Sequence, residues 1–194
     1  MYHFRRPSPD QLAALLAESA TGELSYADVG ISLGAPAPPG YHRLHASREL
    51  GTDGNQDLFA AGRRAIEAWA GHARAGAILE PPRPELSPGS AVALALRVGP
   101  LWVTAACRVV TVIDEVDRYG FAYGTLHHHP ERGEEAFLVT RDPSTGLVGL
   151  EISACSRANS ILTRLGGPIG RWFQHLMARR YLDGFEAVAM ASAP

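Results

Sequence analysis

The alternation of apolar and polar residues is most regular between residues 91 and 157, where it predicts a series of β-strands. The strands that we expect cover residues 41–50, 77–80, 91–98, 101–114, 118–126, 134–141 and 147–157. Most of the connections between the later strands are only a few residues long, which favours antiparallel neighbours. This part of the chain should therefore form an antiparallel meander.

Apolar residues spaced three or four apart predict three helical regions. The first begins at Ser8-Pro9, where Gln11 completes a capping box, and ends near Ser19. The second, over 56–74, has a single apolar stripe. The third, over 158–184, should contain a short helix, a break at 166–168 and a longer helix from Pro168.

These elements together predict an α+β fold. A curved antiparallel sheet of about six to seven strands should grip the long C-terminal helix, with two further helices before the main meander. We expect one domain over 1–194, made of an N-terminal helix and arm (1–24), a core (41–184) and a tail (185–194) that frays. The Pro- and Gly-rich stretch 30–40 should be an ordered loop and not a linker, because too little chain precedes it to fold alone.

Composition excludes several classes of protein. All 18 basic residues are arginine, so a lysine Schiff base, a pyridoxal-phosphate enzyme and a phosphate-loop ATPase are ruled out. The net charge is −2 and the arginines are scattered, which argues against nucleic acid as a partner. No motif indicates a cofactor. No pattern in the sequence indicates an oligomeric state.

The sequence also indicates a cytoplasmic location. It has no apolar run of about 18 residues, so no membrane span is expected. The N-terminal Arg5-Arg6 is followed by Pro7 and polar residues, unlike a signal peptide. The two cysteines, Cys107 and Cys155, have no metal or redox spacing and should be small apolar residues of the core.

The most reactive-looking segment is His127-His128-His129-Pro130-Glu131, followed by Glu134 and Glu135. If it is extended, His127 and His129 point to one side and, with Glu134, offer a two-histidine, one-carboxylate set for Zn²⁺ or Fe²⁺. The alternative, which we favour, is a polar turn without metal, whose histidines are solvated or bonded to backbone. A desolvated glutamate beside His129 is a candidate general base; the alternative is an ion pair with Arg108 or Arg157.

Further candidate binding residues lie within strands or at their ends. Tyr119, Phe121 and Tyr123 share one face of a strand whose other face is bare. This aromatic face is either ordinary core, which we favour, or the lining of a cavity, where the Tyr123 hydroxyl is the best candidate to contact a ligand. Arg108 should lie on the outer face of its strand or pair with Glu131, Glu134 or Glu135. Tyr41-His42 and Ser156-Arg157 stand at strand ends, where binding residues collect but where turns also need polar groups.

The chain resembles a family known as domain of unknown function 1990 over roughly residues 24 to 183. The residues that carry the resemblance are Gly40-Tyr41-His42, Cys107 to Val110, Asp114-Glu115, Gly120 to Leu126, His129-Pro130-Glu131, Gly133-Glu134-Glu135, Ser156-Arg157 and Arg180-Tyr181-Leu182. His127-His128 and Ala158 depart from the family pattern, so a three-histidine site cannot be a family feature. The order of elements also resembles the helix-grip fold of START-type lipid-transfer domains and pollen-allergen-like proteins, which implies a cavity between the sheet and the long helix.

Three hypotheses for function follow. In the first, a small and mostly apolar molecule binds between sheet and helix, oriented by Tyr41, His42, Arg108, Tyr123, His129, Glu135 and Arg157. In the second, the same scaffold is an enzyme that uses His129, Glu131 and Glu134 for proton transfer. In the third, the cavity is filled by the protein's own side chains and the chain is an interaction protein.

Overall fold

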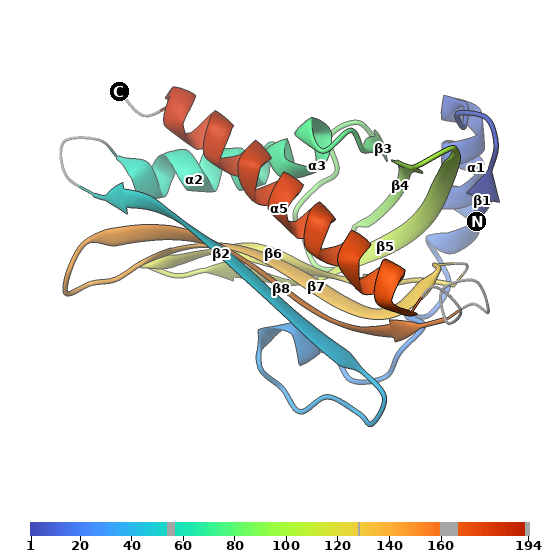
Figure 1. The fold of residues 1–194 in the computed structure, drawn as a ribbon, viewed down its shortest axis with the longest axis horizontal. Coiled ribbons are helices and arrows are strands. Elements are labelled where there is room, and N and C mark those ends of the chain that lie inside the picture. Colours follow the sequence, from blue (N-terminus) through green and yellow to red (C-terminus); the bar gives the residue numbers. More distant parts are fainter. Residues whose placement is uncertain (54–56, 128, 160–166, 193–194) are drawn as a thin grey trace.

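A strongly curved antiparallel sheet wraps around one long helix (Figure 1). The computed structural model describes residues 1–53, 57–127, 129–159 and 167–192. The strands are β1 (Tyr2–His3), β2 (His42–Thr52), β3 (Ile78–Glu80), β4 (Ala91–Val98), β5 (Leu101–Asp114), β6 (Arg118–Thr125), β7 (Glu131–Arg141) and β8 (Leu147–Ala158). The helices are α1 (Pro9–Ser19), the 3-10 turn η1 (Ile31–Leu33), α2 (Leu58–Glu67), α3 (Ala70–Arg74) and α5 (Gly167–Ser192).

Seven strands follow the order β2-β8-β7-β6-β5-β4-β3, and β1 pairs separately with β5. The consecutive strands β3 to β8 form the predicted meander, and β2 is added at the β8 edge, with His42 opposite Ser156. The α+β class, the curved sheet and the long C-terminal helix predicted from the sequence are confirmed. The short strand β1 was not predicted, because two residues are too few to show a pattern.

The inner, concave face of the sheet carries the main core. Alternate residues of the strands point to this face and pack against α2, α3 and α5. Figure 1 shows α5 crossing this face diagonally, while the 3-10 turn η1 and the loop around it lie on the opposite, outer side. Helix α1 covers another part of the outer face, where Leu15 packs with Ala93, Ala106 and Leu126.

The helical regions differ from the sequence prediction at two points. The stripe over 56–74 is divided into α2 and α3 at Trp69, whose backbone is left-handed (φ 53°). The Trp69 side chain is buried and its Nε1 donates to the Pro84 carbonyl at 3.0 Å. Helix α5 continues past Phe185 to Ser192, and Ala189 is fully buried in the core. The short helix expected near 158–165 falls largely outside the described residues; β8 extends to Ala158.

No helix among those that the structure describes is both long and apolar enough to cross a membrane.

Candidate functional site

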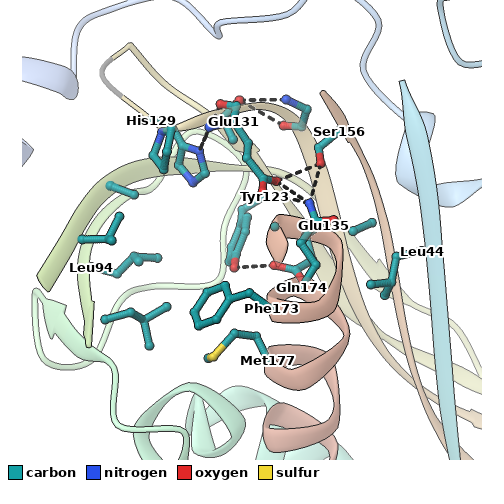
Figure 2. Close-up of a pocket in the computed structure, with 18 of the residues that line it drawn as sticks. Leu44, Leu94, Tyr123, His129, Glu131, Glu135, Ser156, Phe173, Gln174 and Met177 are labelled. Atoms are coloured by element: carbon teal, nitrogen blue, oxygen red, sulfur yellow. Dashed lines mark hydrogen bonds between the residues drawn. The ribbon is translucent and has the colours of Figure 1, made fainter. Parts of the chain in front are cut away.

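A cavity of about 300 Å³ lies between the inner face of the sheet and the first turns of α5. Figure 2 shows it bounded by Leu94 on one side, by Tyr123 on the sheet and by Phe173 and Met177 on the helix. The other residues that border it are Tyr2, Leu44, Leu96, Val98, Val103, Ala105, Thr125, His129, Pro130, Glu131, Gly133, Glu134, Glu135, Ala154, Ser156, Gly170, Gln174 and Tyr181. Most of the wall is therefore apolar, and the polar groups are concentrated on β7 and the strands beside it.

The cavity exists because the space under α5 is filled at one end only. There, Trp69, Phe121, Phe137 and Phe185 are at most 1% exposed, and the Trp69 and Phe121 rings lie 4.6 Å apart. At the other end the strands and α5 present small residues, including Ala105, Ala154 and Gly170. A Cβ atom on Gly170 would have no neighbour within 4 Å. Side-chain volume thus decides where the interior is open.

A chain of three buried polar groups ends at the cavity. The Tyr123 hydroxyl donates to Glu135 Oε2 at 2.8 Å, and Nε2 of His72 lies 3.3 Å from the same hydroxyl. His72 is fully buried among aromatic rings, the nearest being Tyr181 at 4.6 Å between centroids. Burial lowers the pKa of His72 to about 3, raises the pKa of Tyr123 well above 10 and raises the pKa of Glu135 to about 7. His72 is therefore neutral, and Glu135 can change its charge near neutral pH.

A second carboxylate, Glu131, lies on the same face of β7 and is held from two sides. The Ser156 hydroxyl donates to its Oε2 at 2.8 Å, and Nε2 of Gln174 on α5 lies 2.8 Å from both carboxylate oxygens (Figure 2). Burial raises the pKa of Glu131, and the two donors oppose that shift. Glu131 therefore joins β8 and α5 across the polar end of the cavity.

The three histidines do not act together. His127 is exposed, and His128 lies outside the described residues. His129 borders the cavity, and its Nδ1 accepts the Glu131 backbone N–H at 3.0 Å. Burial lowers the pKa of His129 to about 4, so the ring is neutral. Within the described residues no group of three or more His, Cys, Asp or Glu side chains could hold a metal ion.

The Glu134 carboxylate lies on the opposite side of the sheet from Glu135. It accepts hydrogen bonds from the Tyr26 hydroxyl at 2.8 Å, from the Gly30 N–H at 2.9 Å and from the N–H and hydroxyl of Ser32. The residue is 2% exposed. Glu134 was predicted as a proton-transfer group or as an ion-pair partner of an arginine. Its contacts fit neither role, because the carboxylate holds the loop around η1 against the outer face.

Three of the residues predicted to bind a ligand also lie on the outer face. Tyr41, Arg108 and Arg157 border an open hollow of about 680 Å³, with the Arg157 guanidinium 5.3 Å from the centre of the Tyr41 ring. Of the two alternatives for Arg108, the outer position holds: its Nη2 donates to the Ala20 and Gly22 carbonyl oxygens, and the predicted pair with a glutamate is wrong. His42 is exposed at the start of β2, on the same side as Leu44.

Two functional candidates were missed by sequence reasoning. His72 lies in a short helix between Gly71 and Ala73, where no sequence pattern marks it, and only the fold places it beside Tyr123. Gln174 is separated from Glu131 by 43 residues and meets it only because α5 packs back on the sheet. The one sequence feature that could have pointed to Gln174 is helical spacing. Gln174, Met177 and Tyr181 recur at intervals of three and four residues, and all three border the cavity.

The sheet wrapped around α5 and the cavity between them define a helix-grip protein. Solved structures with the same fold include a conserved protein from Geobacillus kaustophilus, with a TM-score of 0.52, 13% identity and coverage of 79% of this chain and 98% of that one. A hypothetical protein from Helicobacter pylori has a TM-score of 0.51 and 10% identity, and covers 87% of this chain and 98% of its own. At these identities the likeness concerns the fold alone.

Sequence comparison gives the family. Residues 25–184 match the family described as domain of unknown function (DUF1990). A UPF0548 protein from Deinococcus radiodurans is 33% identical over 197 residues, covering 93% of this chain and 95% of that protein. A UPF0548 protein from Dictyostelium discoideum is 34% identical over 93 residues, which is 42% of this chain and 43% of its own. The chain belongs to the DUF1990 family, as its resemblance to that family implied.

Replacing Glu134 should weaken the fold. The substitution Glu134→Gln puts an amide NH₂ where the carboxylate accepts several hydrogen bonds, so we expect the free energy of unfolding to fall by about 2–3 kcal/mol. Chemical denaturation measures it. The control is Glu151→Gln on the outer face of β8, where the carboxylate accepts from Thr140 Oγ1 at 3.3 Å. Equal stability of the two variants would contradict the role assigned to Glu134.

Replacing Glu135 should change how stability depends on pH. The pKa of Glu135 is about 7 in the folded protein and near 4.5 when unfolded, so its stabilising contribution is present at low pH and is lost as pH rises toward 7. Relative to wild type, Glu135→Gln should therefore gain about 2 kcal/mol in unfolding free energy between about pH 5 and about pH 8. Denaturation at both pH values, with Glu151→Gln as the charge control, measures this. A constant difference would contradict the raised pKa.

Proposed function

We propose that this protein binds a small, mostly apolar molecule in the cavity under α5. The observation that carries the proposal is the unfilled volume of about 300 Å³ beside the buried aromatic residues Trp69, Phe121 and Phe137. This volume is at the lower end of the range for ligand pockets, and a largely apolar wall with a few polar groups on one side is typical of such pockets. The buried thiols of Cys107 and Cys155 are unpaired, and we place the protein in the cytoplasm on this ground.

The polar groups suited to orient the ligand are Tyr123, His129, Glu131 and Glu135, all of which border the cavity. Tyr41, Arg108 and Arg157 are excluded from this role, because they border the hollow on the other face of the sheet. His42 is exposed and is not part of the cavity wall. Tyr123, His129 and Glu135 therefore remain of the seven residues expected to contact a ligand, and Glu131 is added from the group expected to be catalytic. The hypothesis of an interaction protein with a filled cavity loses its basis, since the volume is open.

The ligand proposal is tested by filling the cavity. The substitution Ala154→Phe adds a ring to the cavity wall, so we expect the affinity for a neutral apolar dye such as 1-aminoanthracene to fall at least about tenfold. Fluorescence titration measures the affinity, and circular dichroism checks the fold. The matched control is Ser47→Phe, which adds the same ring at an exposed position of β2. Failure of the wild-type protein to bind any apolar dye saturably would refute the proposal.

A second candidate function is proton-transfer catalysis in the same cavity. It is favoured by Glu135, a carboxylate with a pKa of about 7 that accepts from Tyr123 beside open volume. In this hypothesis Glu135 and Glu131 are the acid–base residues, in place of Glu134.

The two functions are separated by turnover. If the protein is an enzyme, wild type should convert a compound of a small-molecule extract that Glu135→Gln converts about 10²–10⁴ times more slowly, because one general acid–base group contributes that much. Mass spectrometry of the extract before and after incubation makes the comparison. Identical extracts after both incubations would leave binding as the function.

A further inference from the structure

The charged groups at the cavity are all acidic. Glu131 and Glu135 extend from the inner face of β7, and no arginine or lysine borders the cavity among the residues that the structure describes. The one imidazole there, His129, has a lowered pKa and is neutral. Buried carboxylates are ordinarily paired with a cation, because an unpaired buried charge is costly. Neither carboxylate meets a cation within the described wall.

The two carboxylates are not equally satisfied. Glu131 is held by Ser156 and by Gln174 on both of its oxygens. For Glu135, the Tyr123 hydroxyl bonds to Oε2 at 2.8 Å, and Oε1 accepts no hydrogen bond from any residue within the described ranges. A ligand donor can reach this oxygen without displacing a bond that the protein already makes. Glu135 is thus the acceptor open to a ligand.

The hydrogen bonds behind Glu135 are directed toward a negative charge. When Glu135 is ionised, the single hydroxyl hydrogen of Tyr123 goes to the carboxylate, and the tyrosine oxygen accepts from His72 Nε2–H. His72 Nδ1, which has no partner among the described residues, is then a bare acceptor. If Glu135 donated its own proton to Tyr123, the hydroxyl would turn to His72 and leave an N–H unpaired at Nδ1, and unpaired buried N–H groups are rarer than unpaired acceptors. The ionised form is therefore better satisfied than a form in which Glu135 donates to Tyr123.

The rest of the wall also suits a cation with an apolar body. Tyr123, Phe173 and Tyr181 present aromatic rings, which attract positive charge at their faces. We infer that the ligand is an organic cation, an apolar molecule carrying a protonated amine that pairs with Glu135. This inference rests on the proposed binding function and specifies its ligand class.

The inference sets a direction for pH dependence. The titratable groups that face Glu135 are Tyr123 on β6, Tyr181 on α5, Cys107 on β5 and Glu131 on its own strand, with neutral His72 behind Tyr123. None of these is cationic, and burial raises the pKa values of the tyrosines and of Cys107, which keeps them neutral. With a pKa of about 7, Glu135 ionises as pH rises, while an alkyl amine stays protonated to about pH 10. Affinity for the cation should thus increase with pH.

The test uses three probes of similar shape: 2-phenylethylammonium, the neutral 2-phenylethanol and the anionic 3-phenylpropanoate. Isothermal titration calorimetry of the wild-type protein should give at least about tenfold tighter binding of the ammonium than of the alcohol, since a desolvated ion pair distinguishes them. Between about pH 5.5 and about pH 8.5 the affinity for the ammonium should rise about 30-fold, and that for the alcohol should not change. Near neutral pH, two buffers of different ionisation enthalpy should show proton release on ammonium binding.

The variants locate the charge. Glu135→Gln should remove the preference for the ammonium over the alcohol and the pH dependence of ammonium binding, and Glu151→Gln should keep both. Saturable binding of the alcohol or of the neutral dye, without preference for the ammonium, would overturn the cation inference and leave the ligand-binding function in place. Absence of saturable binding for all three probes and for the dye would overturn both.

Discussion

The structure depends on how the aromatic cluster of Trp69, Phe121, Phe137 and Phe185 fills one end of the space between sheet and helix. A sheet that curves around a helix encloses more volume than the helix occupies, and that volume must be filled or left open. The rings fill it beside α2 and α3, where they fix the distance between α5 and the sheet. Helix α5 is held at that end, and its first turns remain apart from the sheet where small residues such as Ala105, Ala154 and Gly170 leave space. The cavity is thus the result of packing elsewhere.

The polar end of the cavity depends on the alternation of β7. Glu131 and Glu135 share the inner face, while the intervening Glu134 points out and holds the loop around η1. One strand therefore supplies the acidic groups of the interior and the attachment of the outer loop. His72 lies on the far side of Tyr123 from Glu135. It is neutral and buried, and its ring packs against Tyr181. Together these groups place a carboxylate of variable charge beside apolar volume.

Much of the fold could be predicted from the sequence, because strand alternation and helix caps are local signals. The bounds of β4 and β5 agree with the prediction, and Ser8 caps α1 with the expected Gln11. The site was less predictable. Tyr123, His129 and Glu135 could be singled out by residue type and spacing. The sequence did not show which glutamate side chains of β7 point inward, because the strand begins at Glu131 and not at Glu134 as predicted. Arg108 bonds to the end of α1, and His72 and Gln174 meet their partners through long-range packing.

The opposed orientation of Glu134 and Glu135 also matters for reading relatives of this chain. The two residues are identical in type and adjacent, so a sequence alignment can displace them by one position at almost no cost in score. Such a displacement would exchange an interior acid for an exterior anchor, because side chains in a strand change sides at every step. Gly133 and Phe137 flank the two glutamates and define their register in an alignment. Only an alignment that matches both of these residues can tell which relatives share the acidic interior.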